Sequence, residues 1–253
     1  MVDDTDVPND PGWRIIGPDP RIANWAHAAL PRARTALAQT DQPLRCGGTW
    51  AVGLDLLDND AAGTVAGCDL PWAALGLAPQ PLHQAQVSGI YPGYPQPWPG
   101  ESAAAMQYRI SRDAAHLDGL LPIGPDRRRM IKEPHAWILG LALTDCAAAP
   151  LVVWDGSHRV MQSALRRALA AHPPQDWGNI DITDVYQAAR AQVFATCPRV
   201  EVPIVRGQAT LLHRAVLHGV APWPTGFDAG QTDRIIAYFR PMLASVQDWL
   251  LRD

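Results

Sequence analysis

Apolar and polar residues follow two different periods along this chain, and the period predicts which segments are helical and which are extended. Apolar side chains recur at helical spacing between residues 20 and 39, at Ile22, Trp25, Ala26, Ala29 and Leu30. This spacing predicts a helix. Pro31 falls inside the segment and should kink or split the helix, because its ring removes one backbone hydrogen bond.

Short extended segments make up much of the remainder. Apolar runs bounded by turn residues predict strands after Gly47-Gly48-Thr49-Trp50 and over 104–112, 135–144, 150–154, 199–205, 208–216 and 233–240. Two helices are predicted among them, over 159–172 and about 181–195. Short strands with a few helices are typical of a jelly-roll-like sandwich. We expect a mainly β fold with flanking helices, in one domain over residues 1–253 with 1–11 loosely ordered.

Composition narrows the possible partners. Charged residues make up 18% of the 253 residues and the net charge is −4, so no basic surface favours nucleic acid or an anionic membrane. No apolar run is long enough to cross a bilayer, and the first residues are acidic rather than signal-like. We therefore expect a cytoplasmic protein that acts on a small molecule. The four scattered cysteines form no metal-binding pair and are expected to be buried thiols.

Three residues carry the strongest chemical signal. His116 and Asp118 form a His-x-Asp triplet, and His218 follows about a hundred residues later. Residues two apart on a strand point to the same face, about 6.5–7 Å apart, so His116 and Asp118 can reach one ion. Two imidazoles and one carboxylate are the ligand set of non-haem Fe(II) oxygenases, with positions left open opposite.

A second histidine competes for the third position. His213 and His218 have opposite parity, so on one regular strand they face opposite sides. Only one of them can then reach the metal. Parity alone leaves both candidates open. Of the remaining histidines, His135 opens a predicted strand and could face the pocket.

The chain resembles the phytanoyl-CoA dioxygenase-like family of Fe(II)/2-oxoglutarate oxygenases. Three ordered blocks carry the resemblance: His116-Leu117-Asp118, the segment 141–158 with its Gly156-Ser157-His158, and the segment 207–234. The resemblance implies a double-stranded β-helix, the jelly-roll fold shared with cupins. It also implies Fe(II) as the metal, with 2-oxoglutarate and O2 as co-substrates.

The same resemblance assigns the site residues. It makes His218 the third ligand, because His218 precedes Gly219 and lies eleven positions after Gly207. His213 is then a core histidine, and His158 belongs to a structural loop. Halogenating relatives lack the carboxylate, so the presence of Asp118 implies hydroxylation.

The 2-oxoglutarate site needs a cation for the distal carboxylate, and the arginine fork suits it. The resemblance places that role on Arg234, at the start of the strand after His218. The gap from His218 to Arg234 is sixteen residues, longer than is typical of the family, which we interpret as a longer turn. Arg240, at the far end of the same strand, is the weaker candidate.

Two other functions fit a metal-binding β fold. One is a cupin-like isomerase, lyase or 2-oxoglutarate-independent dioxygenase, which would not need Arg234. The other is a non-catalytic binding module, which would not need all three ligands. We expect the pocket walls to come from residues 89–100, residues 119–134 and the region after His158, and the sequence does not identify the substrate.

Overall fold

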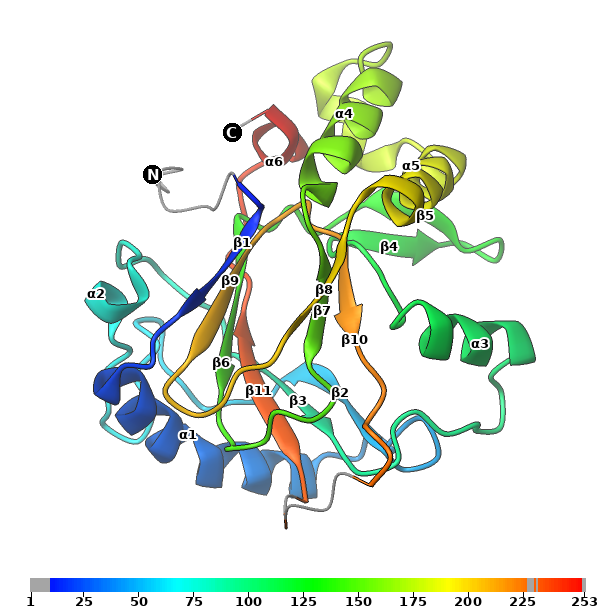
Figure 1. Ribbon diagram of the computed structural model, residues 1–253. Coiled ribbons are helices and arrows are strands. Elements are labelled where there is room, and N and C mark those ends of the chain that lie inside the picture. The colour runs from blue at the N-terminus through cyan, green and yellow to red at the C-terminus, as the bar shows by residue number, and fades with distance from the viewer. Residues whose placement is uncertain (1–9, 227–229, 231, 252–253) are drawn as a thin grey trace.

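Eleven strands form the framework of the computed structural model, which describes residues 10–226, 230 and 232–251 (Figure 1). The strands are β1 (Trp13–Ile16), β2 (Trp50–Asp55), β3 (Gln86–Ile90), β4 (Leu120–Ile123), β5 (Arg128–Ile131), β6 (Trp137–Ala142), β7 (Leu151–Trp154), β8 (Arg199–Val202), β9 (Ala209–His213), β10 (His218–Val220) and β11 (Arg234–Phe239). Six of them form one sheet in the order β1-β9-β6-β11-β3-β2, and three form a second sheet in the order β10-β7-β8. All pairings are antiparallel, and β4 and β5 form a separate hairpin.

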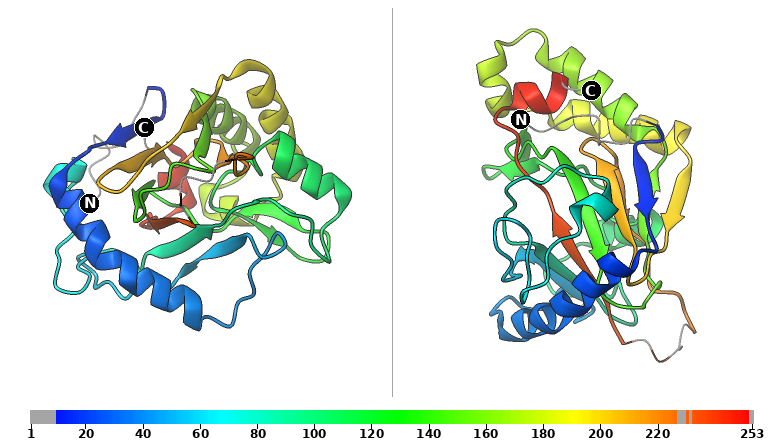
Figure 2. Two further views of the ribbon diagram at one scale, coloured as in Figure 1. Left: turned by 60° about the horizontal axis from the view of Figure 1, so that its bottom comes forward. Right: turned by 90° about the vertical axis from the view of Figure 1, so that its left-hand side faces the viewer.

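The helices lie outside the two sheets (Figures 1 and 2). They are α1 (Pro20–Gln39), α2 (Trp72–Leu75), α3 (Ala103–Ser111), α4 (Ser157–Leu169), α5 (Thr183–Thr196) and α6 (Val246–Leu251). Trp25 of α1 packs against Phe239 of β11 with ring centroids 6.0 Å apart, so α1 covers the outer face of the larger sheet. This is the mainly β fold with flanking helices that the sequence predicts.

Apolar side chains from both sheets pack together in part of the space between them. The larger sheet contributes Ile138, Leu212 and Ile236, and the smaller sheet contributes Leu151 and Val153. Burying such side chains fully stabilises the fold by roughly 1.5–3 kcal/mol each. This inner cluster therefore holds the sheets face to face.

The alternation of β11 divides its side chains between two environments. Ile235, Ala237 and Phe239 belong to the outer core beneath the helices, whereas Ile236 belongs to the inner cluster. Successive side chains on a strand point to opposite faces. Arg234 and Tyr238 have the parity of Ile236, so both lie on the inner face.

The structure corrects the strand predicted over 104–112, because residues 103–111 form the helix α3. The segment begins with three alanines, which favour helix, and Ser102 caps it by accepting a hydrogen bond from the Ala105 amide at 3.2 Å. The other predicted helices are confirmed as α1, α4 and α5. Pro31 does not split α1; it lies exposed on the solvent side, where water can bond the carbonyl that it leaves unpaired.

The strand predicted over 208–216 is also shorter than expected. It ends at His213, and a turn closed by the Val216 amide on the His213 carbonyl leads into β10. The chain passes from the larger sheet to the smaller one within this turn. The prediction that His213 and His218 face opposite sides of one regular strand is therefore wrong, because the two histidines lie in different sheets.

Two predictions fall partly outside the described residues. Of the N-terminal segment predicted to be loose, residues 1–9 lie outside, whereas the Pro11 carbonyl accepts a hydrogen bond from the Gly156 amide. The long connection before Arg234 includes residues 227–229 and 231, which also lie outside. Within the described ranges, no helix has the length and apolar character needed to span a membrane.

Candidate metal centre

The backbone brings His116, Asp118 and His218 together. His116 and His218 form an antiparallel bridge in which each amide donates to the other's carbonyl, at 2.8 and 3.1 Å. His218 opens β10, and the segment carrying His116 and Asp118 is a short extended stretch between α3 and the hairpin. Leu117, between the two ligands, is buried on the other side in the outer core. The bridge therefore aligns three side chains from two distant parts of the sequence.

The three side chains offer ligand atoms close enough for one ion. The Asp118 Oδ1 atom lies 3.3 Å from His116 Nε2 and 3.8 Å from His218 Nε2. Three donors at about 2.1 Å from a metal and at right angles to one another are about 3 Å apart. All three ligand atoms lie within 4.8 Å of one another. Two nitrogens and one carboxylate oxygen on one side of an ion suit iron with open coordination positions.

Main-chain carbonyls fix both imidazoles with the correct nitrogen facing the site. His116 Nδ1 lies 3.1 Å from the Ala114 carbonyl, and His218 Nδ1 lies 2.9 Å from the Val216 carbonyl. A carbonyl only accepts, so each Nδ1 carries the proton and each Nε2 presents its lone pair. Metal-binding histidines are commonly oriented in this way.

The charges at the site favour an ionised Asp118 and a neutral His218. Burial acts to raise the pKa of Asp118, but the hydrogen bond with His116 and the positive charge of Arg240 hold it well below its ordinary value. Burial, followed by the neighbouring His116, lowers the pKa of His218 to about 4. The His116 side chain is 53% exposed, and its pairing with Asp118 raises its pKa above the ordinary value. A cation would displace the proton that this pairing retains.

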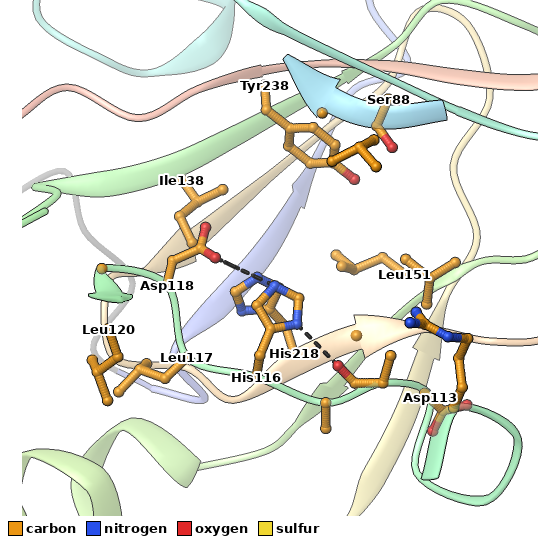
Figure 3. A pocket seen from close by; sticks show the side chains of 18 of the residues that line it. Ser88, Asp113, His116, Leu117, Asp118, Leu120, Ile138, Leu151, His218 and Tyr238 are labelled. Atoms are coloured by element: carbon orange, nitrogen blue, oxygen red, sulfur yellow. Dashed lines mark hydrogen bonds and ion pairs between the residues drawn. The ribbon is translucent and has the colours of Figure 1, made fainter. Parts of the chain in front are cut away.

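A cavity of 740 Å³ opens in front of these residues. Its apolar walls include Ile138, Leu151 and Leu212, and Tyr238 and Ser88 lie across it from the two histidines (Figure 3). Tyr94 from the 89–100 loop and several residues of the 119–134 segment line it, as expected. In the region after His158, Tyr186 and Arg190 of α5 line the cavity, whereas no described residue of α4 does.

The other histidines lie away from the ligand atoms. His213 accepts a hydrogen bond from the Ala215 amide at 3.0 Å, and its ring lies 4.9 Å from that of His158. His135 is buried behind the site, with Nδ1 3.2 Å from the Arg240 carbonyl. All four cysteines are free thiols, and Cys46 and Cys146 are buried, whereas Cys68 and Cys197 are only partly so.

Arg234 opens β11, and Arg240 directly follows its last residue, Phe239, so the two candidate arginines lie at opposite ends of this strand. Arg234 is 2% exposed and pairs in register with Ile90, which lines the cavity. Arg234 itself is not among the lining residues. Arg240 does line the cavity, and its Nη1 donates to Asp118 Oδ2 at 2.8 Å. This contact was not predicted from the sequence, although Arg234, Tyr238 and Arg240 share one parity and therefore one face.

Comparison with known proteins gives only distant likenesses. No family model matches the chain, and no curated protein matches it. Among solved structures, the iron- and α-ketoglutarate-bound epimerase SnoN is 16% identical, with 92% of this chain and 79% of that chain covered and a TM-score of 0.47. The carbocyclase SnoK from nogalamycin biosynthesis is 15% identical (94% and 85% covered, TM-score 0.43), and iron-bound EctD from S. alaskensis is 15% identical (92% and 73% covered, TM-score 0.44).

Proposed function

We propose that the protein is a non-haem Fe(II)- and 2-oxoglutarate-dependent oxygenase of the phytanoyl-CoA dioxygenase-like type, which hydroxylates a C–H bond of a small or medium-sized organic molecule. The observation that carries the proposal is the ligand set. Two Nε2 atoms held by Nδ1 hydrogen bonds and one carboxylate oxygen converge at the edge of a large, mostly apolar cavity. Such a set leaves positions for a bidentate co-substrate and O2.

Each residue has a distinct role in this proposal. His116, Asp118 and His218 hold Fe(II), which together with 2-oxoglutarate and O2 supplies the oxidising chemistry that protein side chains lack. Ile138, Leu151 and Leu212 keep water away from the reacting centre. Because Asp118 fills the carboxylate position, no ligand position is left for a halide, which favours hydroxylation.

Arg234 is proposed to bind the distal carboxylate of 2-oxoglutarate. It lies four positions from Tyr238 along β11, or about 13 Å, on the same inner face. Arg234 forms no ion pair within the described part of the chain, and a buried cation favours an anionic ligand.

Binding of 2-oxoglutarate tests the proposal directly. Without O2, the protein with Fe(II) and 2-oxoglutarate should develop a weak visible charge-transfer band, and with O2 it should release succinate. Arg234→Met should weaken 2-oxoglutarate binding by about 2–5 kcal/mol and leave Fe(II) binding intact. Arg34→Gln is the matched control, since Arg34 pairs with the adjacent Asp233 at the surface.

The outcomes separate the competing functions. Equal 2-oxoglutarate affinity in wild type and Arg234→Met would show that Arg234 does not bind the co-substrate. A metal-bound wild-type protein that never binds 2-oxoglutarate, yet isomerises or cleaves a metabolite, would favour the cupin-like alternative. Tight binding of a ligand without any turnover would favour a binding module.

A further inference from the structure

We propose that Arg240 is a positioning residue for the metal centre, which holds Asp118 as a ligand through one oxygen only. The proposal rests on the proposed function and extends it to the geometry of the carboxylate. Arg240 Nη1 donates to Asp118 Oδ2 at 2.8 Å, while Oδ1 of the same carboxylate faces His116 and His218. The two oxygens of Asp118 thus have different partners.

Burial makes this pairing strong. The Arg240 and Asp118 side chains are 15% and 12% exposed, so water screens their attraction only weakly. A charge-assisted hydrogen bond of this length is among the stronger kinds. Rotation of the carboxylate to bring both oxygens to a metal would break it and leave the guanidinium without its carboxylate.

The backbone of Arg240 is itself held from two sides. Its amide donates to His83 Nε2 at 2.8 Å, and its carbonyl accepts from His135 Nδ1 at 3.2 Å. Neither histidine is one of the three proposed ligands. Arg240 is therefore anchored by its main chain and extends its side chain to Asp118, which is the arrangement of an outer residue that orients a ligand.

Binding of Asp118 through one oxygen determines how many coordination positions of the metal remain open. Six positions surround an octahedral ion, and His116, His218 and Asp118 through one oxygen fill three of them. A carboxylate bound through both oxygens would fill a fourth. Three positions are needed for a bidentate co-substrate and O2, so holding Oδ2 on Arg240 keeps the last of them available.

Cobalt binding tests the role without requiring activity. Apo protein is titrated with Co(II) without O2, and the visible absorption spectrum and dissociation constant are recorded for wild type, Arg240→Gln and Arg240→Lys. Loss of an outer residue that orients a ligand typically costs 10- to 100-fold in metal affinity, so Arg240→Gln should weaken Co(II) binding about 10-fold or more and alter the spectrum. Arg240→Lys retains the positive charge and should recover part of the Co(II) affinity and part of the wild-type spectrum. Arg206→Gln is the matched control, since Arg206 pairs with Asp145 outside the cavity lining.

Other results would overturn the proposal. A purely structural role would lower the melting temperature of Arg240→Gln and leave its Co(II) spectrum and affinity at wild-type values. Unchanged Co(II) binding with lost 2-oxoglutarate binding would instead make Arg240 the co-substrate arginine. If Arg240→Gln does not fold, Arg240→Met decides: a Co(II) spectrum and affinity equal to wild type without any donor to Asp118 Oδ2 would exclude geometric control. Wild-type protein that binds Co(II) but not 2-oxoglutarate would contradict the proposed function and leave the role of Arg240 intact.

Discussion

At the scale of single residues, the site depends on which nitrogen of each histidine is free. His116 and His218 both direct Nδ1 to a main-chain carbonyl, whereas His213 uses its Nδ1 to accept the Ala215 amide. The first arrangement leaves Nε2 for a metal beside Asp118. The second serves a turn in the protein core.

Substitution of the histidines should separate these two roles. His116→Ala, Asp118→Ala and His218→Ala should each reduce Fe(II) binding by more than 100-fold, because each removes one of three ligands. His213→Ala should bind Fe(II) as wild type does. Anaerobic titration followed by the 2-oxoglutarate charge-transfer band measures this, and retained binding in His218→Ala with loss in His213→Ala would reverse the assignment.

His213 should instead control stability in acid. Burial, followed by the charge of Arg214, lowers its pKa to about 2, so the folded protein holds a neutral imidazole that the unfolded chain protonates near pH 6.5. The unfolded state then binds more protons, and the free energy of unfolding should fall by about 1.4 kcal/mol per pH unit below pH 6.

Denaturant unfolding from pH 7 to pH 4 checks the contribution of His213. His213→Asn keeps a side-chain acceptor for the Ala215 amide and cannot be protonated in this range. It should therefore show a shallower loss of stability than wild type. Parallel profiles for the two proteins would show that another group carries the acid sensitivity.

At the scale of elements, the approach of two backbone segments places His218. A Cβ atom added to Gly219 would lie 2.1 Å from the Asp113 carbonyl oxygen, so only glycine allows β10 to pair with the segment carrying His116. The Val220 amide donates to the same carbonyl at 2.9 Å. The backbone contact that pairs β10 with this segment therefore also places His218 beside His116.

Gly219→Ala should disturb both together. Because the clash is with backbone rather than with a flexible side chain, the two segments must separate, and we expect a loss of about 2–4 kcal/mol in stability and at least 10-fold in Co(II) affinity. Gly53→Ala is the control for stability, since its added methyl meets only side-chain atoms, at 3.3 Å or more. A folded Gly219→Ala protein with wild-type Co(II) affinity would show that the close approach is not needed.

At the scale of the whole molecule, one buried ion pair joins the ligand segment to the smaller sheet. Asp113 is 2% exposed and accepts from Arg199 of β8 through both oxygens, at 2.7 and 2.8 Å. The hydrogen bonds with Asp113, followed by that with Glu201, raise the pKa of Arg199 further above its ordinary value. The pair connects the turn after α3 with β8, through two residues that lie 86 positions apart in sequence.

Arg199→Met should leave the Asp113 carboxylate buried without its cation. Breaking a fully buried ion pair costs about 3–5 kcal/mol of stability. Because Arg199 is partly exposed, we expect the free energy of unfolding, measured with urea, to fall by about 2–3 kcal/mol. Arg128→Met is the control, because Arg128 pairs with Asp181 at the surface at 3.5 Å, where such pairs contribute about 0–1 kcal/mol. Equal losses in the two variants would contradict the special role of the buried pair.

The sequence by itself determined the elements whose pattern is local. The periodicity of residues 20–39 and the apolar runs later in the chain predicted α1 and most of the strands, because backbone preference and amphipathic spacing act over a few neighbours. It also predicted three ligand candidates that the fold brings within 4.8 Å of one another. The strand predicted over 104–112 is wrong: the three alanines and the Ser102 cap favour a helix there, although an extended segment leading to His116 was expected.

Only the tertiary structure decided what depends on contacts between distant segments. The bridge from His116 to His218 joins residues about 100 positions apart, and the contact of Arg240 with Asp118 joins residues 122 positions apart. The change of sheet between His213 and His218, five positions apart, places His213 away from the metal site. Even the five-residue step between His213 and His218 was beyond local reasoning, since a turn and a change of sheet replace the regular strand. Local propensity sets which element a segment forms, whereas packing and long-range hydrogen bonds set where its side chains meet.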